Sequence, residues 1–180
     1  ASVGVAVGQP GQREAHQLLS DADAAAYVAK GLGRERVHLF TPGLRDAARW
    51  RLEVANALRD NALDQLVVHY QPVVRVHDGA IDGVEALLRW QHPERGLLTP
   101  DAFLSVAEET GQLIPITRWL LSETTRQAAE WAAQGLDLRM SVNLSASNLL
   151  DAGLPARVAD LLDEHVIRST DLVLEVTESV

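Results

Sequence analysis

The chain has 180 residues, 47% of them hydrophobic, which suits one domain or slightly more with a sizeable core. Its formal net charge of −9 argues against a nucleic-acid polymer or an anionic membrane surface as the main partner. Because it has no cysteine, a metal ion would need oxygen or histidine ligands, which favours Mg²⁺, Mn²⁺ or Ca²⁺. No apolar run approaches the roughly 18 residues that span a bilayer, so no membrane segment is expected.

The first third of the chain predicts alternating strands and helices. A strand-like run at 1–7 precedes a helical pattern at 14–30, and a short strand follows at 36–40. Thr41 and Pro42 then predict the cap and first residue of an amphipathic helix. We expect this helix to connect two regions of the chain.

The next stretch predicts a β-hairpin. Residues 66–76 and 81–90 each form an apolar, strand-like run, and Asp78-Gly79 lies between them. Asp-Gly is a strong hairpin signal, so these two strands should be antiparallel.

After the hairpin, helical and strand patterns alternate to the end of the chain. Helices are expected at 99–110, 114–134 and 155–164, and strands at 138–143 and 171–176. This alternation predicts an α/β fold in which helices cover a parallel sheet.

Polar side chains recur near the carboxyl ends of the predicted strands. Glu85 lies within an apolar strand and shares a strand face with Arg89, while Asn143 and Glu175 occupy later strands. Since a charge in apolar surroundings needs a partner, Glu85, Asn143 and Glu175 could converge on one divalent cation. The alternative is a partly exposed strand on which Glu85 and Arg89 are two solvated charges.

Other candidates have weaker support. His69, His77 and His92 lack metal-ligand spacing and are interpreted as packed or solvated side chains. Glu108 and Glu109 are expected to form a solvated helix end. The chain has no P-loop or dinucleotide fingerprint.

Six motifs together resemble those of EAL domains, phosphodiesterases of the bacterial second messenger cyclic di-GMP. The motifs are Tyr70-Gln71-Pro72, Glu85-Ala86-Leu87-Leu88-Arg89-Trp90, His92-Pro93, Ala107-Glu108-Glu109-Thr110-Gly111, Ser141-Val142-Asn143-Leu144-Ser145 and Glu175-Val176-Thr177-Glu178-Ser179. The resemblance implies a TIM-like (β/α) barrel whose first strand is antiparallel.

The resemblance also implies roles for individual residues. It makes Glu85 catalytic and a metal ligand together with Asn143 and Glu175, and it makes Gln71 and Arg89 substrate contacts. Glu178 would support a catalytic loop. The implied mechanism is two-metal hydrolysis with Mg²⁺ or Mn²⁺, in which metal-bound water attacks and the linear dinucleotide is released.

The beginning of the chain resembles the C-terminal end of a GGDEF domain, the α+β fold of cyclic di-GMP synthases. The matching pieces are Ala1-Ser2-Val3-Gly4-Val5-Ala6, Ala22-Asp23-Ala24-Ala25-Ala26-Tyr27-Val28-Ala29-Lys30 and Gly33-Arg34. In that family the lysine and the arginine contact nucleotide phosphates, which implies such roles for Lys30 and Arg34.

These resemblances predict a GGDEF tail at 1–41, a connecting helix at 42–63 and the N-terminal half of an EAL domain at 64–180. A complete barrel needs roughly 250 residues, so a partial barrel is expected, with an incomplete two-metal site and no turnover by the fragment alone.

The parent protein is expected to be cytoplasmic in character, or tethered to a membrane through N-terminal sequence. Its expected ligand is cyclic di-GMP, and it is expected to form a homodimer through the EAL domain. Two alternatives to a hydrolase stay open. One is a degenerate EAL domain that senses cyclic di-GMP or relays the state of the GGDEF half, and the other is a packing fragment without activity.

Overall fold

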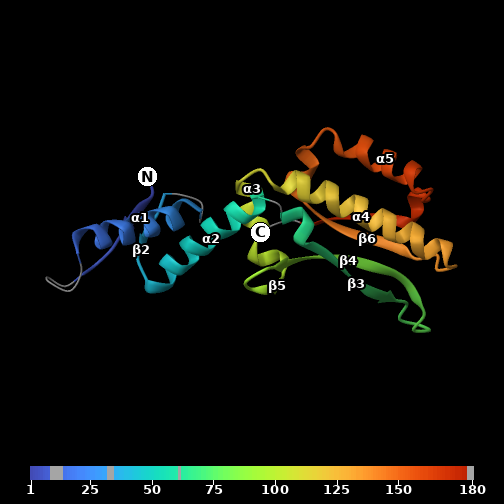
Figure 1. Ribbon diagram of the computed structural model, residues 1–180, viewed down its shortest axis with the longest axis horizontal. Coiled ribbons are helices and arrows are strands. Elements are labelled where there is room, and N and C mark those ends of the chain that lie inside the picture. The colour runs from blue at the N-terminus through green and yellow to red at the C-terminus, as the bar shows by residue number, and fades with distance from the viewer. Residues whose placement is uncertain (9–13, 32–34, 61, 178–180) are drawn as a thin grey trace. The chain divides into compact units, whose positions relative to one another are not determined.

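The computed structural model describes residues 1–8, 14–31, 35–60 and 62–177 (Figure 1). The chain divides into two compact units, 1–56 and 57–180, which are described separately. The predicted roles of Arg34 and Glu178 fall outside the described residues.

The first unit packs one helix against a small parallel sheet. Its elements are β1 (Val3–Val5), α1 (Ala15–Gly31), β2 (Val37–Leu39) and most of α2 (Pro42–Asp60). Gly4 lies so close to α1 that a Cβ there would stand 2.0 Å from the Ala22 carbonyl oxygen. Only glycine allows this approach, so close packing of α1 on β1 depends on that position.

A partly buried ion pair joins the two helices of this unit. The Asp21 carboxylate on α1 is wholly buried and pairs with Arg45 on α2. The Arg45 guanidinium also lies 5.8 Å from the centre of the Phe40 ring. This contact links α1 to α2 within the first unit.

The second unit is a mixed α/β structure, as the sequence predicts. Its sheet has the order β3-β4-β6-β7, with β5 paired to β4. Strands β4, β6 and β7 are parallel, whereas β3 is antiparallel to β4. The described residues form an open sheet and no closed barrel. The elements are η1 (Ala62–Gln65), β3 (Leu66–Val74), β4 (Ile81–His92), β5 (Gly96–Leu98), η2 (Pro100–Ala102), α3 (Leu104–Glu109), α4 (Leu113–Ala133), β6 (Arg139–Ser145), η3 (Ala146–Leu150), α5 (Leu154–Glu164), η4 (Ser169–Asp171) and β7 (Leu172–Thr177).

The predicted hairpin is confirmed. Strands β3 and β4 pair in an antiparallel register that sets Gln71 opposite Glu85. In the turn, Gly79 has φ +70° and the Asp78 carboxylate accepts a hydrogen bond from the Ala80 backbone at 3.1 Å. A positive φ suits glycine and the Asx-type bond suits aspartate, which explains the local signal.

The two faces of this sheet differ in burial. Helices α4 and α5 lie beside each other on one face, called the outer face here (Figure 1). Its side chains on β4 and β6 are buried: Val84, Ala86, Leu88, Trp90, Met140, Val142 and Leu144. The opposite, inner face carries Gln71, Glu85, Asn143 and Glu175, which are half-buried or exposed. Alternation along each strand therefore separates core residues from candidate site residues.

Two local expectations differ from the structure. The helix expected at 99–110 is divided into η2 and α3, because Phe103 between them has φ −142°, which is not helical. Strand β5 is not among the predicted strands, since three residues give too short a pattern to detect. Among the described residues, no helix combines the length and apolar character needed to cross a membrane.

Candidate functional site

The three predicted metal ligands lie on the inner face, on three neighbouring parallel strands. The Asn143 side-chain nitrogen on β6 is 2.6 Å from Glu85 Oε1 on β4. Glu175 on β7 is directly opposite Asn143 in the strand register. The β4–β6 register pairs Glu85 with Ser141, so Asn143 lies one pleat further toward the carboxyl end. The fold thus brings Glu85 and Asn143 into contact and places Glu175 beside them.

The chemistry of these side chains suits a hard divalent cation. Two carboxylates and an amide oxygen are ligands typical of Mg²⁺ or Mn²⁺, which keep several waters. Among the described residues, no three His, Cys, Asp or Glu side chains are grouped to hold a metal ion by themselves. The candidate set therefore depends on Asn143, whose amide presents its nitrogen to Glu85 here and would present Oδ1 after a flip.

The two predicted substrate contacts belong to the same face of the hairpin. Gln71 is exposed and paired in register with Glu85, while Arg89 is half-buried further along β4. One Arg89 nitrogen donates to the Leu88 carbonyl oxygen at 2.7 Å. The guanidinium has five donors, so this bond leaves most of them for an anion.

A pocket of about 490 Å³ lies beside Asn143. It is lined by Pro100, Asp101, Leu104, Ser105, Glu108, Leu113, Asn143, Leu144 and Ser145. The Glu108 carboxylate in this pocket accepts a hydrogen bond from the Ser147 hydroxyl. Glu108 is exposed in the last turn of α3, as expected of a solvated helix end, and its side chain also has a specific partner on the turn after β6.

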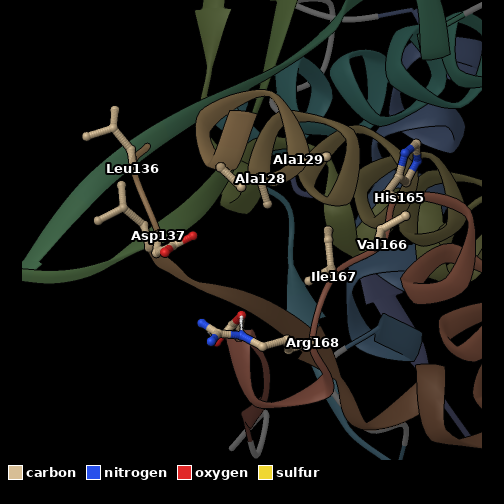
Figure 2. A pocket seen from close by; sticks show the side chains of 11 residues that line it. Ala128, Ala129, Leu136, Asp137, His165, Val166, Ile167 and Arg168 are labelled. Atoms are coloured by element: carbon tan, nitrogen blue, oxygen red, sulfur yellow. Dashed lines mark hydrogen bonds and ion pairs between the residues drawn. The ribbon is translucent and has the colours of Figure 1, made fainter. Parts of the chain in front are cut away.

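A second pocket, of about 420 Å³, lies at the amino ends of β6 and β7. Figure 2 shows Arg168, His165 and Asp137 around it, and the Arg168 guanidinium pairs with Asp171 at 2.6 Å. It contains none of the predicted site residues. We place the candidate site on the inner face of the sheet, where Glu85 within β4 meets Asn143 near the carboxyl end of β6.

No expectation from the sequence concerned the turn after β6. Asn148 there is 3% exposed and hydrogen-bonded to Thr117 at 2.8 Å, although the two residues are 31 positions apart. The local signal was a serine three residues before a side-chain amide, Ser145 and Asn148, which is a capping-box pattern. Its link to α4 could not be found from spacing.

The predicted GGDEF-tail contacts belong to the first unit. Lys30 lies exposed in the last turn of α1. The described residues do not test whether Lys30 contacts a phosphate. Its role stays a prediction, as do those of Arg34 and Glu178.

Comparison with known protein families shows to which family the chain belongs. The sequence matches the EAL domain family over residues 53–180, which is more than half of the chain. The chain therefore belongs to the EAL domain family. Its mixed α/β fold with a parallel-dominated sheet matches the solved EAL structures that it resembles.

Two relatives match almost the whole chain. One is the bifunctional diguanylate cyclase/cyclic di-GMP phosphodiesterase MucR of Pseudomonas aeruginosa, 43% identical over 182 residues. The other is the cyclic di-GMP phosphodiesterase PdeR of Escherichia coli, 38% identical over 180 residues. Each match covers 99% of this chain but only 26% and 27% of the relative. The chain thus spans about a quarter of the length of these relatives.

Solved structures agree. The PaMucR phosphodiesterase in complex with c-di-GMP has a TM-score of 0.67 and 46% identity, covering 71% of this chain and 52% of that one. The FimX EAL domain of Xanthomonas citri, also in complex with c-di-GMP, has a TM-score of 0.63 and 25% identity, covering 74% and 53%.

Proposed function

We propose that this chain forms part of a cyclic di-GMP phosphodiesterase that opens one phosphodiester bond and releases the linear dinucleotide. The observation that carries the proposal is the 2.6 Å contact between Asn143 and Glu85 on the inner face, with Glu175 opposite Asn143. Two relatives carrying this activity in their names support it, as does the c-di-GMP complex of a structure 46% identical to this chain.

Glu85, Asn143 and Glu175 would hold a Mg²⁺ or Mn²⁺ ion through their side-chain oxygens. Such an ion, when bound, lowers the pKa of water and offsets negative charge on phosphoryl oxygens. The protein's own task is to keep the two carboxylates and the amide on one rigid sheet face. All three side chains lie on strands rather than on loops, which favours such rigidity.

Arg89 would bind a phosphate of the substrate, and Gln71 would make a polar contact with it. Both lie on the inner face, which helices α4 and α5 leave open. A planar guanidinium matches phosphate oxygens with paired hydrogen bonds. Glu178 is proposed to support a catalytic loop.

We infer that the 180 residues alone do not hydrolyse cyclic di-GMP. The match to the PaMucR phosphodiesterase structure covers 52% of that chain, so this chain corresponds to about half of that structure. The resemblance to EAL domains implies that the second metal ion and the attacking water also need groups from the rest of a complete barrel. A homodimer through the complete EAL domain is part of the same proposal.

Residues 1–41 are proposed to be the C-terminal end of a GGDEF domain, joined by a connecting helix at 42–63 to the EAL region at 64–180. The name of the MucR relative, which includes a diguanylate cyclase, supports this arrangement. Lys30 and Arg34 would contact nucleotide phosphates there.

The test uses a protein that carries this chain within a complete EAL domain. Calorimetry with cyclic di-GMP in Ca²⁺ measures binding, and chromatography after incubation in Mg²⁺ or Mn²⁺ measures conversion to the linear product. Binding with conversion, abolished by a chelator, supports the phosphodiesterase. Binding in both metals without conversion supports the sensor alternative, and no binding in either contradicts both.

A further inference from the structure

We propose that Asn148 is a positioning residue that fixes the end of β6 and thereby the place of Asn143 in the candidate metal site. This inference rests on the proposed function, because it assumes that Asn143 holds a metal ion. The Asn148 side chain is buried, and its hydrogen bonds go to Ser145 and to Thr117 on α4 rather than to Glu85 or Asn143.

The Asn148 side chain links β6 to the helix that covers the outer face. Its amide nitrogen donates to Thr117 Oγ1 on α4 at 2.8 Å, and its Oδ1 accepts from the Ser145 backbone nitrogen at 2.9 Å. The Ser145 N–H can only donate, so the orientation of the amide is settled by its partners. Asn148 and Thr117 are 3% and 6% exposed, so both bonds are shielded from water.

A second link holds the other side of the same turn. The Ser147 backbone nitrogen donates to Ser145 Oγ at 3.2 Å, completing the capping box with Asn148. The Ser147 hydroxyl then donates to the Glu108 carboxylate on α3. The turn η3 is thus tied to α4 by Asn148 and to α3 by Ser147, immediately after the strand that carries Asn143.

This bracing matters because Asn143 has little packing of its own. Its side chain is exposed on the inner face, so its position follows from the backbone of β6. Ser145, which Asn148 holds through its backbone, lies two residues further on the same face. A ligand must be held within about 0.5 Å of its productive place, and loss of such outer supports typically costs 10–100-fold in metal affinity.

The experiment compares Asn148→Ala, Thr117→Val and Thr117→Ser in a protein carrying the complete EAL domain. Mn²⁺ alone is titrated by calorimetry, and turnover of cyclic di-GMP is measured in saturating Mn²⁺, both well below each variant's unfolding temperature. Thr117→Val keeps the volume of the side chain but removes the acceptor of Asn148, whereas Thr117→Ser retains it. If Asn148→Ala does not fold, Thr117→Val tests the same hydrogen bond, and Thr117→Ser is its matched control.

We expect Asn148→Ala to weaken Mn²⁺ binding about ten-fold or more and Thr117→Val to weaken it several-fold. Thr117→Ser should bind Mn²⁺ as the wild type does. Two-dimensional NMR should show the Asn143 side-chain amide signal displaced in the first two variants only. Wild-type metal affinity and signal position in folded Asn148→Ala or Thr117→Val would overturn the inference while leaving the phosphodiesterase intact. Failure of the wild type itself to bind Mn²⁺ and hydrolyse substrate would overturn both.

Discussion

The outer and inner faces of the mixed sheet differ although they are made from the same strands. On β4, Val84, Ala86 and Leu88 are buried toward the helices, while Glu85 between them is half-buried on the other side. A strand of period two allows one residue to serve the core and the next to serve a site. Stability and chemistry can therefore be altered separately here by a substitution one position further along the same strand.

The largest expected effect is on the outer face. Trp90 is wholly buried, and its indole nitrogen donates to Gln65 Oε1 at 2.9 Å. Trp90→Ala should lower the free energy of unfolding by about 3–5 kcal/mol, through lost burial and an unfilled cavity. Denaturant unfolding measures it. Leu87→Ala, on the inner face of the same strand, is the control and should cost no more than about 1–2 kcal/mol. Equal losses would contradict the division into two faces.

The next effect is on activity and concerns the inner face. In a complete EAL domain, Glu85→Gln should reduce kcat/KM for cyclic di-GMP more than about 100-fold, roughly 2.7 kcal/mol, because a proposed metal ligand loses its charge. The free energy of unfolding should change little, since a glutamine can still accept from the Asn143 amide. Retained hydrolysis, or a loss of activity explained by unfolding, would remove Glu85 from the site.

A smaller effect is expected at Arg89, further along the same face. Arg89→Ala should raise KM for cyclic di-GMP about ten-fold, roughly 1.4 kcal/mol, by removing a charged hydrogen bond to phosphate. Mn²⁺ affinity should stay unchanged, which separates this residue from the ligand set. Arg89→Lys should recover part of the loss. An unchanged KM would assign Arg89 to the sheet alone, where it bonds the Leu88 carbonyl.

The smallest effect is a pH dependence on the outer face. Burial, with a contribution from Glu123, raises the pKa of Tyr70 from 10.0 to about 12. Its hydroxyl oxygen is buried, and its ring meets Trp131 edge-on at 4.8 Å. The folded state therefore retains the proton that the unfolded state loses, so stability is full below pH 10 and falls toward pH 12.

Denaturant unfolding at pH 9 and pH 11.5 should show a larger loss in the free energy of unfolding for the wild type than for Tyr70→Phe. Parallel losses would exclude Tyr70 as the cause.

Local signals in the sequence were sufficient for much of the fold. The Asp78-Gly79 turn, the alternating strands and the periodic helices each depend on neighbours a few positions away, so sequence patterns could predict them. The same alternation put Glu85, Asn143 and Glu175 on one face of the sheet. What sequence patterns could not supply was contact across the fold. Glu108 and Ser147 are 39 positions apart, and no periodicity indicates that their side chains meet.

The antiparallel hairpin has a consequence for the order of assembly. Strands β3 and β4 are joined by a short turn, so Gln71 can face Glu85 as soon as the hairpin closes, within about 1–10 μs. Glu85 and Asn143 are 58 positions apart, and their contact must wait until α4 packs and a much longer loop closes. During refolding, pulsed hydrogen exchange should protect the β3–β4 amides before those of β6 and β7. The substrate-contacting half of the site would then act as the template on which its metal-binding half is completed.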